Sequence, residues 1–385
     1  MERKFFLIIA LVLINLTGCI VNSKYAMLYD EFQKKDSVID SKIESSMLKR
    51  LIRPDNTNIF FEGRIDRLSD KSVRFDWPGV RIRFRFMGTS CYIWLEDGGN
   101  DYNVYLDGKK ISVLSTVPGK YLYSILENLQ SGEHEVCLSK RTEGSFGVAV
   151  FKGIILNEGG SLLAFNSSYK KKIQFIGDSI TCGYGNEGNG RNCKELRPYE
   201  NNDLTYARIT ASAFDADAHI IAISGKGMVR NYGDKTVTSI DPLPVFYDRI
   251  LQQDPSKRWD HKSWIPDAVV IALGANDFST EPSPDEKTWS KAYEEFILKI
   301  RKIYPETKIF CVVTRIKYST IFSYLTKLVE KLNSAGDMNI FFVQFPEAEG
   351  EDGGCDWHPL VKAHQVFADT LIKVISENTG WSTVR

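Results

Sequence analysis

The sequence predicts two folded domains, an all-β sandwich of the jelly-roll type followed by an α/β domain built on a parallel sheet. Residues 56–160 contain several short runs in which polar and apolar residues alternate, separated by Gly-Gly and Asp-Gly turn signals. Residues 168–380 instead contain near-continuous apolar runs that alternate with amphipathic helical segments, a pattern typical of parallel sheets covered on both faces. The length of 385 residues suits this division into two domains.

The charged residues of the chain are evenly balanced. Lys and Arg together number 49, as do Asp and Glu, so the formal net charge is +0. A protein that binds nucleic acid needs a surplus of Lys and Arg to contact phosphates, so the balance argues against such a partner. We expect a monomer.

Residues 1–19 are predicted to be an export signal. A short basic segment precedes an almost unbroken apolar run over 5–16, which is too short to span a bilayer comfortably. The run ends in Leu-Thr-Gly-Cys at Cys19, which resembles the bacterial lipobox and implies cleavage before Cys19 and lipid attachment to its thiol. An ordinary signal peptide or an N-terminal membrane helix is the alternative. We therefore expect an exported lipoprotein at the outer membrane or cell surface, with residues 20–55 as a polar tether.

The sandwich is predicted from strands with one buried face. In the segment 80–86, Arg alternates with apolar residues, which is the period of a half-buried strand. Further short strands are expected at 91–95, 104–106, 133–138 and 147–155. Several short strands without a convincing helix indicate a sandwich of roughly a hundred residues.

A linker rich in Gly, Asn and Ser at 157–170 leads into the α/β domain. Its expected strands are 173–176, 219–223, 268–273, 308–313 and 339–343, and its expected helices are 204–214, 285–303 and 361–375. In such domains sites form at the carboxyl ends of the parallel strands. Residues with chemical roles are therefore expected directly after these strands.

Four polar segments meet this expectation. Ser179 follows the first strand, Gly225 the second and Asn276 the third, and His358 lies in a Gly-Cys-Asp-Trp-His-Pro string near the end. Each segment alone could be an ordinary loop, because Gly, Asp, Ser and Asn are common turn residues. Together they supply what acyl transfer needs, namely a hydroxyl nucleophile, a base and hydrogen-bond donors for the developing oxyanion.

In content and order, the four segments resemble the signature blocks of SGNH or GDSL-type hydrolases, which have a three-layer α/β/α fold. The resemblance covers residues 173–378. It implies that Ser179 is the nucleophile and His358 the general base. It also implies an oxyanion hole made by the N–H groups of Ser179 and Gly225 and the side-chain amide of Asn276. The absence of a G-x-S-x-G elbow argues against an α/β-hydrolase.

The segment around His358 is similar to one branch of these enzymes, carbohydrate esterase family 2. Most SGNH members place an acid three residues before the His, whereas Asp356 lies two before it. This spacing, the Gly-Tyr-Gly that begins at Gly183 and the preceding sandwich all resemble family 2. In some of these relatives the acid is missing and a backbone carbonyl orients the His. Either Asp356 or a carbonyl is therefore expected to hold His358.

The resemblance also suggests how a substrate is bound. Relatives of family 2 use an aromatic clamp after the Gly225 block, where Tyr232 stands here. Sugars present apolar faces that stack on aromatic rings. Tyr318 is a second candidate wall, and Trp357 is expected either to pack on His358 or to line the pocket.

A disulfide between Cys182 and Cys193 is predicted, because both lie in the loop after the nucleophile and export permits oxidation. The sequence contains no C-x-x-C pair and no evident group of three or four converging ligands. We therefore expect neither a metal nor another cofactor.

The favoured function is that of a carbohydrate O-acetyl esterase similar to acetylxylan esterases, with a 6-O-acetyl hexose in a plant polysaccharide as its substrate. A lipid esterase or thioesterase of the GDSL type is one alternative. A non-catalytic, carbohydrate-binding surface lipoprotein is another, which is less favoured because a binding protein does not need a base beside a Ser.

Overall fold

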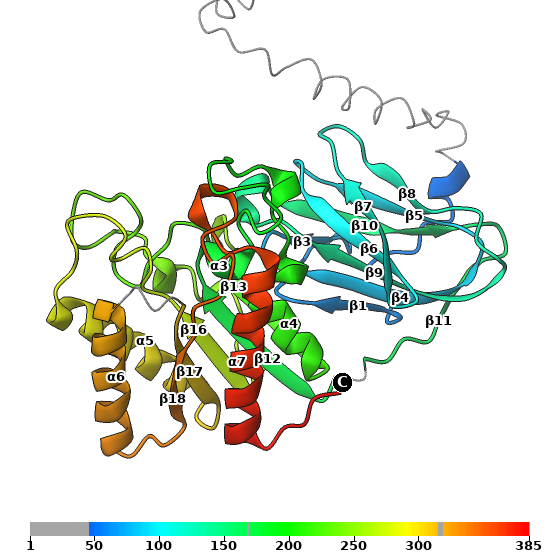
Figure 1. Cartoon of the computed structure of the whole chain (residues 1–385). Coiled ribbons are helices and arrows are strands. Elements are labelled where there is room, and N and C mark those ends of the chain that lie inside the picture. The colour runs from blue at the N-terminus through cyan, green and yellow to red at the C-terminus, as the bar shows by residue number, and fades with distance from the viewer. Residues whose placement is uncertain (1–45, 168, 315–318, 385) are drawn as a thin grey trace, which may run out of the picture. The chain divides into compact units, whose positions relative to one another are not determined.

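The computed structural model describes residues 46–167, 169–314 and 319–384 (Figure 1). Residues Leu51–Arg385 form one compact unit. The predicted signal peptide with Cys19, most of the predicted tether, and Tyr318 lie outside the described residues. Within the part of the chain that is described, none of the helices has the length and apolar character needed to cross a membrane.

The first domain is a sandwich of two antiparallel sheets. One sheet has the order β1-β4-β9-β6-β7 with β11 paired to β4, and the other has the order β2-β3-β10-β5-β8. The strands are β1 Ile59–Glu62, β2 Asp66–Arg67, β3 Val73–Phe75, β4 Arg81–Gly88, β5 Cys91–Glu96, β6 Asp101–Leu106, β7 Lys109–Ser115, β8 Leu122–Leu126, β9 Gly132–Lys140, β10 Ala149–Leu156 and β11 Ser161–Leu163. In β4 the side chains of Ile82, Phe84 and Phe86 are buried. Arg83 and Arg85 pair with Glu135 and Glu133 of β9 at 2.7 Å each.

The second domain has a parallel sheet of order β13-β12-β16-β17-β18. Its strands are β12 Lys171–Gly177, β13 Ala216–Ala222, β16 Ala268–Ala272, β17 Lys308–Val313 and β18 Ile340–Gln344. Because β12 pairs with β13 on one side and β16 on the other, the chain changes winding direction there. Ligands in open α/β sheets bind at the carboxyl end of such a switch point. That position is directly after Gly177.

Helices cover both faces of this sheet (Figure 1). They are α4 Tyr206–Ala213 and α7 Val361–Thr379 on one face, and α5 Glu286–Ile303 and α6 Ser319–Ser334 on the other. The side chain of Asp285 caps α5 by accepting from the N–H of Thr288 at 2.7 Å. Two elements were not predicted from the sequence, namely α6 and the short hairpin of β14 Arg249–Leu251 and β15 Asp254–Arg258. The predicted sandwich and parallel α/β/α domain are confirmed.

Buried polar contacts join the sandwich to the α/β domain. Arg208 of α4 pairs with Glu62 of β1, and both side chains are buried. The carboxylate of Asp203 accepts hydrogen bonds of 2.7–2.8 Å from the sandwich residues Arg81, Asn103, Tyr105 and Ser139. Removing one partner of such a buried charge is strongly destabilising. These contacts therefore hold the sandwich in one position beside the sheet.

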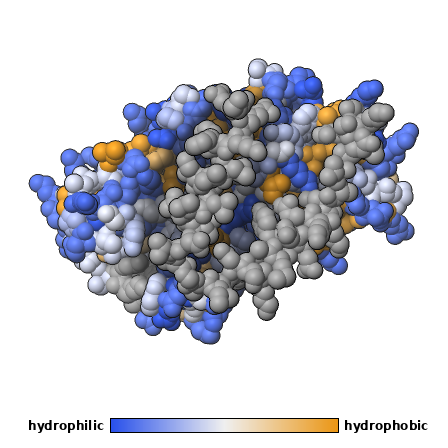
Figure 2. All heavy atoms as spheres, turned by 90° about the horizontal axis from the view of Figure 1, so that it is seen from above, coloured by the Kyte–Doolittle hydropathy of each residue, from blue (hydrophilic) through white to orange (hydrophobic). Residues whose placement is uncertain are grey.

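The surface of the molecule mixes hydrophilic and hydrophobic residues. Among the described residues in view in Figure 2, hydrophobic side chains occur in separate small groups. Scattered apolar residues are ordinary on folded proteins and need no docking partner to explain them.

Candidate active site

Ser179 stands at the switch point of the sheet, as the first residue of the short helix α3 Ser179–Cys182. The preceding Asp178 caps this helix by accepting from the N–H of Ile180 at 3.1 Å. A Cβ at Gly177 would lie 2.0 Å from Oγ1 of Thr181, so only glycine permits the sharp turn out of β12. The turn places Ser179 at the carboxyl edge of the sheet with 7% of its surface exposed.

The ring of His358 contacts Ser179 from the other end of the chain. Nε2 of His358 lies 2.8 Å from Oγ of Ser179. Nδ1 faces two backbone carbonyl oxygens, that of Cys355 at 3.0 Å and that of Asp356 at 3.1 Å. The ring of Tyr184 covers the imidazole, with 4.2 Å between ring centroids. The imidazole is thus oriented so that a proton on Nδ1 leaves Nε2 free to accept one from Ser179.

The side chain of Asp356 makes different contacts. Its carboxylate accepts a hydrogen bond of 2.9 Å from the hydroxyl of Tyr184 and pairs with Lys194 at 2.5 Å. Burial raises the pKa of Asp356, but the bonds from Lys194 and Tyr184 outweigh it and hold the pKa below its usual value. Asp356 and Trp357 have φ angles of 48° and 64°, which non-glycine residues seldom adopt. This turn directs the carbonyls of Cys355 and Asp356 at the imidazole.

Gly225 and Asn276 lie at the ends of the neighbouring strands. Gly225 has φ of 77°, and a Cβ added to it would meet no heavy atom of the described residues within 4 Å, so space is open beside it. The amide of Asn276 donates to the carbonyl of Lys226 at 2.9 Å and to Oδ2 of Asp178 at 3.4 Å. These bonds bring the segments after β12, β13 and β16 together.

The loop that follows Gly225 is held by Asp277. This fully buried carboxylate accepts from the N–H groups of Met228, Val229 and Arg230 at 2.8–2.9 Å. Burial raises the pKa of Asp277 to about 6, and the three N–H groups oppose that rise. Asp277 therefore has a structural role in shaping the loop.

Two of the predicted substrate-binding aromatics are exposed. The N–H of Tyr232 donates to the carbonyl of Gly225 at 2.9 Å, which holds its backbone beside Gly225, and 62% of Tyr232 is exposed. Trp357 is half exposed, with the guanidinium of Arg191 4.6 Å from its ring centroid. Tyr184, whose ring covers His358, was not predicted as a site residue, although the Gly-Tyr-Gly string that contains it was a visible signal.

The predicted disulfide between Cys182 and Cys193 is wrong, because Cys193 is bonded to Cys355. Cys182 ends α3 with its side chain buried, and its thiol donates to Oε2 of Glu143 at 3.7 Å. The loop that carries Cys193 instead runs beside the loop that carries His358, where the N–H of Asp356 donates to the carbonyl of Cys193 at 3.0 Å. The bridge therefore joins the segment after the candidate nucleophile to the segment of the candidate base.

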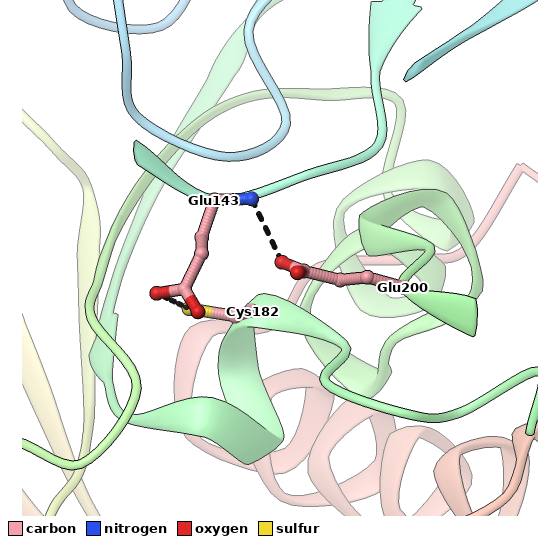
Figure 3. A group of neighbouring side chains, drawn as sticks. All are labelled: Glu143, Cys182 and Glu200. Carbon is pink, nitrogen blue, oxygen red and sulfur yellow. Dashed lines mark hydrogen bonds between the residues drawn. The ribbon is translucent and has the colours of Figure 1, made fainter. Parts of the chain in front are cut away.

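One group of described residues has the composition of a metal site. Ligand atoms of Glu143, Cys182 and Glu200 lie within 4.8 Å of one another (Figure 3). The sequence did not reveal this group because its members come from three separate segments. Burial raises the pKa of the Cys182 thiol and of the Glu200 carboxyl well above their usual values. Within the group the thiol of Cys182 donates to Oε2 of Glu143 at 3.7 Å, and the N–H of Glu143 donates to Oε1 of Glu200 at 2.8 Å.

The assembled site has the parts required for acyl transfer. A serine hydroxyl is hydrogen-bonded to an oriented imidazole, and a backbone N–H at an open glycine and a side-chain amide lie on the adjacent loops.

Comparison with known proteins agrees with this chemistry. The family model described as Carbohydrate esterase 2 N-terminal matches residues 61–165, and that of the GDSL-like Lipase/Acylhydrolase family matches residues 175–365. The chain is 36% identical over 335 residues to Cellulase/esterase CelE of Acetivibrio thermocellus, covering 85% of this chain and 40% of that protein. It is 31% identical over 325 residues to an acetylxylan esterase / glucomannan deacetylase of Cellvibrio japonicus, covering 80% of this chain and 87% of that protein.

A solved structure shows the same two-domain arrangement. A family two carbohydrate esterase from Clostridium thermocellum, in complex with cellohexaose, superposes with a TM-score of 0.80 at 35% identity. The match covers 84% of this chain and 99% of that one. The fold, the site and these relatives agree, and the chain belongs to carbohydrate esterase family 2.

Proposed function

We propose that the protein is a serine esterase that removes O-acetyl groups from carbohydrates through an acyl-enzyme. The observation that carries the proposal is the 2.8 Å contact between Oγ of Ser179 and Nε2 of His358 at the switch point of the sheet. The names of the relatives, an acetylxylan esterase / glucomannan deacetylase among them, support an acetylated carbohydrate as the substrate class.

The first half of the reaction acylates Ser179. Its Oγ attacks the acetyl carbonyl carbon while Nε2 of His358 takes the hydroxyl proton. The imidazolium that forms is stabilised at Nδ1 by the carbonyl oxygens of Cys355 and Asp356, at 3.0 and 3.1 Å. His358 then returns the proton to the sugar oxygen, which leaves as an alcohol. Water repeats the same steps on the acetyl-enzyme and releases acetate.

The charge on the tetrahedral intermediate needs donors in fixed positions. The N–H groups of Ser179 and Gly225 and the amide of Asn276 fill this role. Of the two bonds that the amide makes, the one to Asp178 is long at 3.4 Å, so that hydrogen is the one available to an oxyanion. Fixed donors of this kind are a major source of rate enhancement.

The substrate is proposed to be a 6-O-acetyl hexose of a plant polysaccharide. A primary 6-hydroxyl ester projects furthest from the ring and can reach a site at the base of a turn. The test is acetate release from a panel of acetylated glycans, together with nitrophenyl esters of increasing chain length. We expect 6-acetylated glucose or mannose units and nitrophenyl acetate to be preferred. Preference for 2- or 3-acetylated xylose would refute the position, and preference for octanoate would favour a lipid esterase.

Tyr232 is proposed to stack on the sugar ring. Replacing Tyr232 by Ala is expected to lower kcat/KM for acetylated sugars about tenfold or more and to change that for nitrophenyl acetate less than about twofold. The reason is that remote binding energy helps only when it positions the reacting ester, and nitrophenyl acetate has no sugar ring to stack. The exposed aromatic Tyr121 of the sandwich, replaced by Ala, is the control. Equal losses on both substrates would mean that Tyr232 supports the loop rather than the sugar.

The protein is further proposed to be a membrane-anchored lipoprotein. The support is the apolar run that ends in Leu-Thr-Gly-Cys at Cys19. Replacing Cys19 by Ser should move the protein from the membrane fraction to the soluble fraction or block its maturation, as judged by fractionation and mass spectrometry. A wild-type protein that carries no lipid would contradict this proposal.

A further inference from the structure

One carboxylate of the sandwich domain reaches the back of the active site. Glu143 follows β9, and only 4% of it is exposed. Its Oε2 accepts a hydrogen bond of 2.9 Å from the N–H of Ser224. The same oxygen accepts one of 3.7 Å from the thiol of Cys182 (Figure 3). Ser224 directly precedes Gly225, and Cys182 ends the helix that begins at Ser179. A single oxygen thus contacts both the oxyanion loop, defined as residues 224–232, and the nucleophile helix.

The segment that carries Glu143 is itself firmly held. The N–H of Glu143 donates to Oε1 of Glu200 at 2.8 Å, and the ammonium of Lys140 donates to the carbonyl of Glu143 at 3.1 Å. Arg141 pairs with Glu187 at 2.5 Å, and its carbonyl accepts from the N–H of Asn202 at 3.0 Å. With its backbone fixed on both sides, Glu143 presents its carboxylate at one defined position.

The oxyanion loop is held at two points that flank one peptide group. On one side Glu143 binds the N–H of Ser224, and on the other side the N–H of Tyr232 binds the carbonyl of Gly225 at 2.9 Å. The peptide between these two points carries the N–H of Gly225. Donors to an oxyanion act through a preset direction and distance. The bond between Glu143 and the N–H of Ser224 therefore helps to fix the direction in which the N–H of Gly225 points.

We propose that Glu143 is a positioning residue for catalysis, through which the sandwich domain sets the Gly225 N–H relative to Ser179. The inference rests on the proposed function, because it requires that an oxyanion form beside Gly225. Through Glu143 the sandwich would take part in the chemical step, in addition to any contact that it makes with the glycan. The active site of this protein is then incomplete without its first domain.

The test compares side chains of similar length at this position in the full-length protein. Glu143→Met fills the space but has no oxygen acceptor, whereas Glu143→Gln keeps an amide oxygen that can accept from Ser224. We expect Glu143→Met to lower kcat for nitrophenyl acetate about 10- to 100-fold with KM within about twofold. Glu143→Gln should keep kcat within about threefold of the wild type.

A matched control separates positioning from stability. Glu135→Ala removes the ion pair with Arg83 between β9 and β4 of the sandwich, so it should lower the melting temperature and leave kcat unchanged. Melting curves and circular dichroism check that each variant is folded, and Glu143→Ala replaces Glu143→Met if the latter is not. A folded Glu143→Met or Glu143→Ala variant with wild-type kcat, or an equal loss in Glu135→Ala, would overturn the inference. Failure of the proposed function would appear differently, as an active Ser179→Ala variant.

Discussion

Replacing Ser179 by Ala is expected to lower kcat/KM for acetate esters on the order of 10³-fold or more, with little change in melting temperature. The hydroxyl is the only group lost, and its oxygen is the atom that would bond to the acetyl carbon. The donors that remain, namely the N–H groups of residues 179 and 225 and the amide of Asn276, can stabilise only a reaction with water. Because Ser179 makes its side-chain contact to His358 at a partly open edge of the sheet, its removal leaves no buried partner in the core.

The measurement is acetate release by the purified variant beside the wild type, with melting curves for both. Ser212→Ala is a suitable control, because Ser212 is an exposed serine on α4, away from the carboxyl edge of the sheet. Turnover close to that of the wild type in Ser179→Ala would end the proposal of an acyl-enzyme. A general loss in both variants would indicate damage to the fold instead.

Replacing His358 by Ala should be about as severe as replacing Ser179, whereas Asp356→Asn should lower kcat/KM by less than about tenfold. Without the imidazole, Ser179 has no base. Without the Asp356 charge, the carbonyls of Cys355 and Asp356 still face Nδ1. Asn is the informative replacement, because it tolerates the φ of 48° at this position better than Ala does.

Kinetic constants of the two variants, measured on nitrophenyl acetate, decide between a backbone-oriented and a side-chain-oriented base. Asp356→Ala serves as a comparison. If its kcat/KM is lower than that of Asp356→Asn, the additional loss comes from the φ of 48° at this position and not from the missing charge. If Asp356→Asn is as inactive as His358→Ala, the protein uses a strict Ser-His-Asp triad. In that case the carbonyl contacts would not be sufficient to hold the imidazole.

Much of the fold and the main site residues could be predicted from the sequence, because their signals are local. The alternation in β4 and the apolar runs of β12 and β16 each record the burial of one strand within a few residues. Ser179 and Asn276 lie within four residues of the ends of β12 and β16, and parallel strands bring their carboxyl ends to one edge. The sequence by itself therefore determined the two domain classes and the positions from which the candidate nucleophile and donors come.

Contacts between distant segments could be decided only by the tertiary structure. The sequence suggested Cys182 as the partner of Cys193 because the two are near in the chain, but the fold brings Cys193 to Cys355. It likewise left open which group orients His358, because that depends on the positive φ angles of Asp356 and Trp357. The contact of Glu143 with Ser224 joins two domains. Such pairings follow from the packing of whole elements, which no local pattern of residue types records.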